Sequence, residues 1–308
     1  MSFFTELDAD LYRRDAFDGF DAKARFTLGN ARAMMWLCQL SYETAHRSKI
    51  DTILSRWQLT KIDVLERGLT SSLRMSQTCG VIAATGNATI VVFAGTDPAS
   101  AEDWIKDFTL GRPTGDIHAG FDAAAAAVQD RVRKAAADGT TAGRKLFIAG
   151  HSLGGAIAVA TALRMIEDPQ SNTREAEVYC FGAPRALRPS MTGRYGSLMS
   201  TTYRLVHGND VVACVPPSTL DFVHVGRPLL CPHGGLFDEA KLPQSFDDVP
   251  QFNAQVADGL LQFVRDPLDV PFRPRPGLIG LLFAALPPGV RDHVPDAYLH
   301  ALGTPIIS

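Results

Sequence analysis

Residues 145–155 read KLFIAGHSLGG, an apolar run that ends in a Gly-x-Ser-x-Gly pattern, and an alanine-rich segment follows directly. The apolar run predicts a strand and the next segment predicts a helix, so Ser152 would lie at the sharp turn between them. Such a turn strains the backbone of the serine and projects its hydroxyl above the sheet. Gly150 and Gly154 fit this geometry because side chains there would collide where strand and helix meet. The positive end of the helix favours negative charge at the same place. The pattern therefore predicts that Ser152 is a nucleophile.

A nucleophilic serine needs a base, and the base needs an acid that orients it. For this kind of turn the expected order along the chain is Ser, then Asp or Glu, then His. Residues 202–207 predict a buried strand, and Asp210 comes just past its carboxyl end, where α/β sheets build their sites. Asp168 follows a helix and Asp221 opens the next predicted strand. We therefore expect Asp210 to be the acid.

Four histidines follow this aspartate and compete for the role of base. His224 lies inside residues 221–226, an alternating pattern typical of a strand, and His300 lies two helical turns beyond His293. His233 lies in a loop rich in Pro and Gly, which positions a side chain poorly. His293 lies in a turn before a short final helix, from which an imidazole can reach a neighbouring strand end. We expect His293 to be the base and keep His233 as the alternative.

A second segment is suited to stabilise an oxyanion. Residues 87–97 read NATIVVFAGTD, a β-branched run that ends in Gly95 and Thr96. The backbone N–H of Thr96, together with its hydroxyl, would join the backbone N–H of Leu153, the residue after the nucleophile. Gly95 lets the main chain approach the site closely. We expect Thr96 and Leu153 to form the oxyanion hole.

Further short motifs lie between and after these residues: DWIKD at 103–107, HAGF at 118–121, FGAPR at 181–185, NDVV at 209–212 and DH at 292–293, followed by Tyr298. Together with FAGT at 93–96 and GHSLGG at 150–155 they resemble, in this order, the class 3 lipases, a family that includes secreted fungal triacylglycerol lipases. The resemblance covers residues from about 75 to 217 and resumes at the terminal histidine. It implies the triad Ser152, Asp210 and His293. The chain departs from the family in carrying Ala94 where Arg is frequent, and in the long separation of the acid from the base.

The expected elements alternate as a mostly parallel sheet requires. They are a helix at 30–42, a hairpin of 81–84 with 89–93, a helix at 120–137, a strand at 145–149, a helix at 153–166, and strands at 176–181 and 202–207. This order predicts an α/β-hydrolase fold, a central mostly parallel sheet flanked by helices, with a loop-rich helical C-terminal insertion. Of the 19 prolines, 14 lie beyond residue 210, which favours loops and short helices there over further sheet.

Composition agrees with one catalytic domain over residues 1–308, with residues 218–290 as an insertion that forms a lid or binds the acyl chain. No glycine-serine linker divides the 308 residues, and a net charge of −3 gives no electrostatic footprint for nucleic acid. The five cysteines are odd in number and lack metal-ligand spacing, so we expect neither a disulfide framework nor a metal. The first ten residues carry acids where a signal peptide has a basic start, so we expect a cytoplasmic protein without a transmembrane segment.

Two apolar segments are candidates for contact with a lipid. Residues 277–286 read GLIGLLFAAL, which is too short to cross a bilayer and suits either a buried helix or an interfacial lid. Leu281, Leu282 and Phe283 would then face the substrate. Trp104 and Phe108, beside the oxyanion segment, are a second lid candidate.

These features predict a serine carboxylic-ester hydrolase, a lipase that cleaves acylglycerol esters through an acyl-enzyme and needs no metal or organic cofactor. Its partner would be a lipid or ester substrate at a lipid–water interface. An esterase for short soluble esters and a phospholipase A1 are alternatives within the same chemistry. An acyltransferase and a non-catalytic lipid-binding homologue are alternatives of a different class.

Overall fold

The computed structural model describes residues 5–68, 77–95, 115–168, 173, 175–244 and 288–305. Its centre is a seven-stranded sheet in the order β1-β2-β3-β4-β5-β6-β7. The strands are β1 (Thr60–Gly68), β2 (Gln77–Ala84), β3 (Ala88–Phe93), β4 (Lys145–His151), β5 (Glu177–Phe181), β6 (Thr202–His207) and β7 (Arg227–Cys231). The first three strands pair antiparallel, and β3 to β7 pair parallel. The carboxyl ends of β3 to β7 therefore meet at one edge of the sheet.

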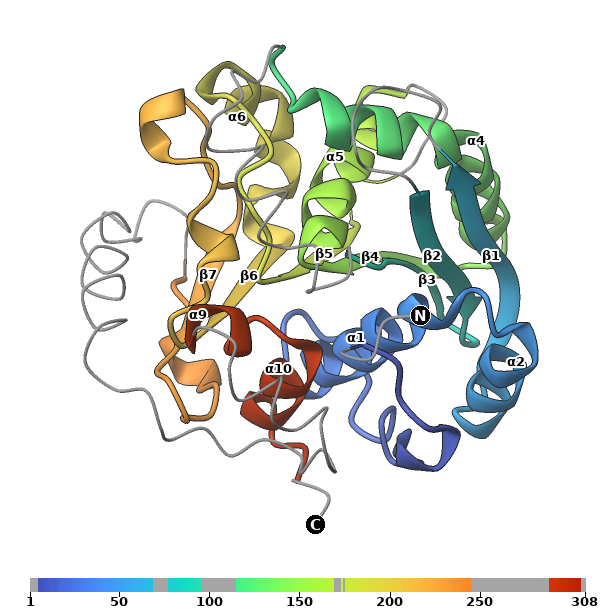
Figure 1. The fold of residues 1–308 in the computed structure, drawn as a ribbon. Helices are drawn as coiled ribbons and strands as arrows, with labels where there is room; N and C mark the ends of the chain where they lie inside the picture. The colour runs from blue at the N-terminus through green and yellow to red at the C-terminus, as the bar shows by residue number, and fades with distance from the viewer. Residues whose placement is uncertain are drawn as a thin grey trace.

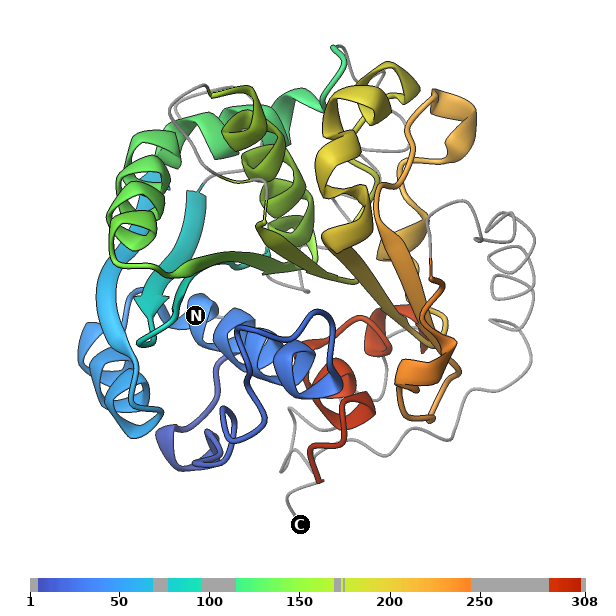
Figure 2. The same cartoon turned by 180° about the vertical axis from the view of Figure 1, so that it is seen from behind.

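Helices cover both faces of this sheet (Figure 1). The α-helices are α1 (Leu28–Leu40), α2 (Arg47–Arg56), α4 (Ala119–Thr141), α5 (Leu153–Glu167), α6 (Pro189–Tyr195), α9 (Pro288–Arg291) and α10 (Pro295–Ala301). Short 3-10 helices are η1 (Ala9–Leu11), η2 (Ser41–Glu43), η4 (Gly196–Thr201), η5 (Val212–Cys214), η6 (Ser218–Leu220) and η7 (Glu239–Lys241). Helices α4, α5 and α6 lie on one face, and α1, α2 and α10 lie on the other, as the view from behind also shows (Figure 2).

Each face has its own apolar core, because successive strand residues point to opposite sides. On the β4 strand, Phe147 and Ala149 pack with α1 and α10, whereas Ile148 packs with α4 and α5. All six residues of β3 and all five of β5 are buried, as expected for inner parallel strands covered on both sides. This arrangement is the α/β-hydrolase fold predicted from the sequence.

Two expectations beyond residue 210 are wrong. Residues 221–226 do not form a strand; Val223 makes only an isolated bridge to Leu187, and Asp221 has a positive φ of 63°. The strand is instead β7, which pairs parallel with β6 inside the segment expected to lack sheet. Pro228 is compatible with β7 because this strand is at the edge of the sheet, where a missing N–H need not face a neighbour.

The described helices include none that is long and apolar enough to cross a membrane. All five cysteines lie in described parts of the chain and are free thiols. Burial raises the pKa of Cys38 well above its usual value and that of Cys180 to about 12. These two buried thiols therefore behave as small apolar side chains.

Candidate active site

Ser152 lies at the turn between β4 and α5 with φ 59° and ψ −133°. A positive φ is unusual for a residue other than Gly, so the backbone of this serine is strained, as the sequence pattern predicts. Its N–H donates to the carbonyl of Phe181 at 2.8 Å, which ties the turn to the end of β5. The serine is buried, with 2% of its surface exposed.

The glycines around Ser152 are required by close backbone contacts. A Cβ at Gly150 would lie 2.5 Å from the backbone nitrogen of Gly155, and a Cβ at Gly154 would lie 2.7 Å from the carbonyl carbon of Phe93. A Cβ at Gly95 would lie 2.5 Å from the Cβ of Ser152. Non-bonded atoms do not approach this closely. The strand β4, the turn and the helix α5 can therefore pack together only because glycine, which has no Cβ, occupies these positions.

Asp210 lies just past the end of β6, and its carboxylate is buried and fully engaged. His293 Nδ1 lies 2.8 and 3.0 Å from its two oxygens. The hydroxyl of Tyr298 donates to Oδ2 at 2.6 Å, and the N–H of Val212 donates to Oδ1 at 2.8 Å. Burial and the charge of Asp210 raise the pKa of Tyr298 well above its usual value, so this hydroxyl keeps its proton and remains a donor. Both oxygens of this carboxylate therefore accept hydrogen bonds from groups of other elements.

His293 lies in the turn between α9 and α10 and is buried. Because an ionised carboxylate only accepts, Nδ1 of His293 carries the proton of this contact. In the neutral ring Nε2 is then an acceptor, and within the described residues no atom hydrogen-bonds to it. The structure thus joins an acid and a histidine that are 83 positions apart in the chain.

Gly182 connects this pair to the serine. It follows Phe181, whose carbonyl binds the N–H of Ser152, and it has a positive φ of 57°. A Cβ at this position would lie 2.9 Å from His293 Nδ1 and 2.8 Å from the Tyr298 hydroxyl. The predicted triad residues are therefore gathered at the carboxyl ends of β4, β5 and β6.

Two of the other candidate histidines, His224 and His233, are engaged elsewhere. His224 Nε2 bonds to the carbonyl of Ala213 at 2.8 Å. Burial, followed by the positive charges of Arg204 and Arg185, lowers the pKa of His224 well below its usual value. His233 Nδ1 lies 2.9 Å from both oxygens of Asp292, a different buried carboxylate. None of these contacts involves Asp210.

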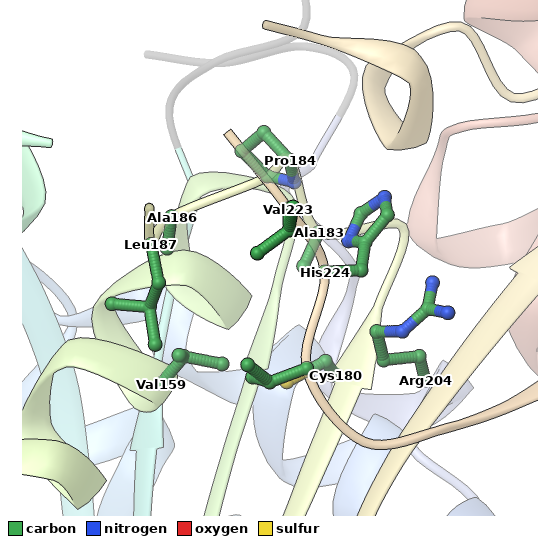
Figure 3. Close-up of a pocket in the computed structure, with 10 residues that line it drawn as sticks. Val159, Cys180, Ala183, Pro184, Ala186, Leu187, Arg204, Val223 and His224 are labelled. Atoms are coloured by element: carbon green, nitrogen blue, oxygen red, sulfur yellow. The ribbon is translucent and has the colours of Figure 1, made fainter. Parts of the chain in front are cut away.

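A pocket in the described part of the chain lies beside His224 and is not part of this gathering (Figure 3). Its lining residues are Val159, Cys180, Ala183, Pro184, Ala186, Leu187, Arg204, Val223, His224 and Val225. None of the predicted triad residues lines it.

Of the predicted oxyanion donors, Leu153 is the first residue of α5, where backbone N–H groups have no partner within the helix. Thr96 lies outside the described residues, as do all the lid candidates: Trp104, Phe108, Leu281, Leu282 and Phe283. Sequence reasoning missed the role of Tyr298 as a donor to Asp210. The only sequence signal for it was the tyrosine five residues after His293.

Comparison of the sequence with known protein families identifies the family that this chain resembles. Residues 90–220 match the model of the family described as lipase (class 3). This region of the chain, residues 90–220, is therefore a class 3 lipase region. This match includes Ser152 and Asp210, and ends before His293.

Individual lipases also match part of the chain. Secreted mono- and diacylglycerol lipase 1 of Fusarium solani is 29% identical over 154 residues, which are 47% of this chain and 45% of that protein. A lipase of Rhizopus niveus is 29% identical over 44% of this chain and 36% of its own length. The chain thus matches less than half the length of these curated relatives.

Solved structures show the same fold. Lipase II from Rhizopus niveus superposes with a TM-score of 0.53 at 22% identity, covering 73% of this chain and 92% of that one. The Rhizomucor miehei lipase propeptide complex gives 0.54 at 22% identity, covering 72% and 75%. At this level of identity the likeness supports the α/β-hydrolase fold alone.

The cytoplasmic location expected from the first ten residues is wrong. The matching Fusarium solani protein is named a secreted lipase, and this finding contradicts the expectation. The expectation rested only on the charge of the first ten residues, and that charge carries no information about the proteins that this chain resembles.

Proposed function

We propose that this class 3 lipase is a serine carboxylic-ester hydrolase that cleaves acylglycerol esters through a Ser152–His293–Asp210 triad. One observation carries the proposal: His293 holds a buried carboxylate with Nδ1 and leaves Nε2 as an acceptor, beside a serine in a strained strand-to-helix turn. A hydroxyl becomes a strong nucleophile only when such a base removes its proton.

In the first step Ser152 Oγ attacks the ester carbonyl while Nε2 of His293 takes the hydroxyl proton. The ring becomes an imidazolium with both nitrogens protonated. The Asp210 carboxylate, 2.8 Å from Nδ1, stabilises this charge, and the Tyr298 hydroxyl and the Val212 N–H hold the carboxylate in place by donating to it. The imidazolium then protonates the leaving alcohol, and the acyl group remains on Ser152.

The negative charge on the carbonyl oxygen needs donors that are in place before it forms. The Leu153 N–H at the start of α5 supports this role, because the N-terminal end of a helix favours negative charge. Thr96 is the proposed second donor; Gly95, which precedes it, approaches Ser152 closely. Water, activated by the same histidine, then releases the acid and restores the serine.

Acylglycerol is the proposed substrate class because the matched Fusarium solani relative is named a mono- and diacylglycerol lipase. We further propose one domain over 1–308 in which residues of 218–290 other than β7 contribute to substrate binding. Within the proposal, Trp104, Phe108, Leu281, Leu282 and Phe283 are the residues that contact the acyl chain at a lipid–water interface.

The test is hydrolysis of p-nitrophenyl esters from acetate to palmitate, below and above the solubility limit of each, with Ser152→Ala as the blank. We expect rates that peak at medium or long chains and rise when an interface forms, and no turnover by Ser152→Ala, because loss of the nucleophile costs about a million-fold. A preference for short soluble esters without that rise would make the protein an esterase. Turnover by Ser152→Ala would refute the triad.

A further inference from the structure

The catalytic base proposed above is held by a second histidine, the residue immediately before Ser152. His151 Nε2 lies 2.7 Å from the backbone carbonyl oxygen of His293. The two imidazole rings are stacked, with centroids 4.8 Å apart and planes 29° from parallel. His151 Nδ1 in turn lies 2.7 Å from the hydroxyl of Tyr42.

The chemistry of these atoms fixes where the protons lie. A carbonyl oxygen only accepts, so Nε2 of His151 must be the protonated nitrogen. In a neutral ring Nδ1 is then an acceptor, so the hydroxyl of Tyr42 must donate to it. The hydrogen bonds therefore run from Tyr42 to His151 and from His151 to the His293 carbonyl.

Burial supports this assignment, because it lowers the pKa of His151 well below its usual value, and the charge of His293 acts in the same direction. His151 is fully buried and therefore stays neutral while His293 becomes an imidazolium during turnover. The two stacked rings never carry charge together.

We propose that His151 and Tyr42 are positioning residues for the catalytic base: their hydrogen-bond chain fixes the backbone of His293, and the stacked ring fixes the tilt of its imidazole. This inference rests on the proposed function, because it assigns a role relative to His293 as base. It goes beyond the triad by linking the base to a residue of η2, which follows α1.

Positioning matters here because His293 lies on a short connection and not on a strand. The turn is held locally by the His293 N–H to the Val290 carbonyl at 3.2 Å and by the Val294 N–H to the Arg291 carbonyl at 3.3 Å. Both bonds are long compared with the 2.7 Å contact from His151. Among these three hydrogen bonds the shortest thus comes from β4, the strand that ends directly before Ser152.

Tyr42 also lies close to the nucleophile itself. A Cβ at Gly95 would lie 2.7 Å from the Tyr42 hydroxyl and 2.5 Å from the Cβ of Ser152, so the three groups share one small region. The hydroxyl proton of Tyr42 is committed to His151, so this tyrosine does not serve as an oxyanion donor. Its role is exerted through His151.

The test compares two replacements of His151 that differ in hydrogen bonding. In His151→Gln the amide places one donor and one acceptor about as far apart as the two ring nitrogens, so both bonds can be kept. In His151→Leu the side chain remains bulky and apolar but both bonds are lost. Tyr42→Phe removes only the first donor. The control is Tyr195→Phe, which also removes a buried hydroxyl. Tyr195 is the last residue of α6, and its hydroxyl lies 2.8 Å from that of Thr202.

For each variant kcat and KM on p-nitrophenyl butyrate, the rate of Ser152 labelling by a fluorophosphonate, and Tm are measured. We expect kcat of His151→Leu to fall about 100-fold with KM unchanged, because misplacement of a catalytic group by about 1 Å has that effect. Tyr42→Phe should lose about tenfold, which corresponds to one hydrogen bond. His151→Gln should recover most of kcat, and Tyr195→Phe should keep all of it.

The outcomes separate this inference from the proposed function. If wild-type protein neither hydrolyses esters nor reacts at Ser152, the proposed function fails. If wild type is active and both Tyr42→Phe and His151→Leu keep its kcat, the positioning role is overturned. A kcat as low in His151→Gln as in His151→Leu, at equal Tm, would also overturn the hydrogen-bond chain. If His151→Leu does not fold, Tyr42→Phe against Tyr195→Phe decides.

Discussion

Substitution of Gly182 by alanine should damage the site through one methyl group. Gly182 has a positive φ of 57°, where alanine is strained by about 1–2 kcal/mol relative to its usual conformations. Its Cβ would lie 2.8 Å from the Tyr298 hydroxyl and 2.9 Å from His293 Nδ1, and closer still to Oδ2 of Asp210. Ordinary contacts of carbon need about 3.5 Å, so these groups must retreat by about 0.6 Å or more.

This retreat separates groups that now hydrogen-bond at 2.6 to 2.8 Å. Because a shift of about 1 Å in a catalytic group costs about 100-fold, we expect kcat of Gly182→Ala to fall by about one to two orders of magnitude. The folded state should lose about 1–3 kcal/mol from backbone strain and overpacking. The assay is kcat on a soluble p-nitrophenyl ester, with urea unfolding for stability.

The matched control is Gly193→Ala in α6, where a Cβ would meet no atom within 4 Å. This change should leave kcat intact and raise stability by up to about 1 kcal/mol, since alanine is the better helix former. Gly182→Ala with the kcat of wild type would refute the reasoning, because the close approach would then not constrain the acid and base.

Three further results are expected. Asp210→Asn should fold and lose about 10⁴-fold in kcat, because an amide favours the wrong tautomer of His293; a loss below tenfold would remove Asp210 from the triad. Burial lowers the pKa of His118 to about 4, so the unfolded state binds a proton that the folded state does not as pH falls from about 6.5 to 4. Folded stability should therefore decrease over that window by about 3 kcal/mol on account of this residue, and less in His118→Asn, measured by urea unfolding at each pH. Because all five cysteines are free, dithiothreitol should leave Tm unchanged, and a fall would indicate a disulfide.

The nucleophile turn could be predicted because its signals are local. Gly150, Ser152 and Gly154 lie within five positions, and the strand and helix that flank them have clear apolar patterns. β6 also begins and ends where the pattern indicates, because all six of its residues are buried. Such elements can be predicted from their local sequence, since burial on both faces requires a continuous apolar run.

Elements stabilised by distant partners could not be predicted in this way. β1 contains Lys61, Asp63 and Glu66, which are unusual in a strand. Asp63 is neutralised by Arg131 of α4, at 2.6 Å between Nε and Oδ2, a partner 68 positions away. β7 contains Pro228 and is possible only because it is at the sheet edge. Both segments form strands because of their position in the sheet, and a local sequence pattern does not reveal that position.

The same limit applies to the site. The sequence pattern placed His293 in a turn before a helix and Asp210 after a strand, but it did not indicate the contacts that His151 and Tyr42 contribute. These contacts exist only after the sheet, α1 and α10 have packed together. Local patterns therefore identified the candidates Ser152, Asp210 and His293 and missed Tyr42 and His151, which are linked to His293 by hydrogen bonds only in the folded chain.

The placement of His293 has a consequence for the order in which the molecule becomes active. The serine and the acid lie on strand ends, which form with the sheet, whereas the histidine arrives with the segment 288–305. That segment docks through Tyr298 and Leu299 on the α1 core and through a bond from the Phe237 N–H to the Ala301 carbonyl at 2.8 Å. A molecule with a complete sheet but an undocked α10 would have Ser152 without its proposed base. During refolding, esterase activity should therefore appear only after α10 has docked. Its appearance then measures the time at which folding is complete.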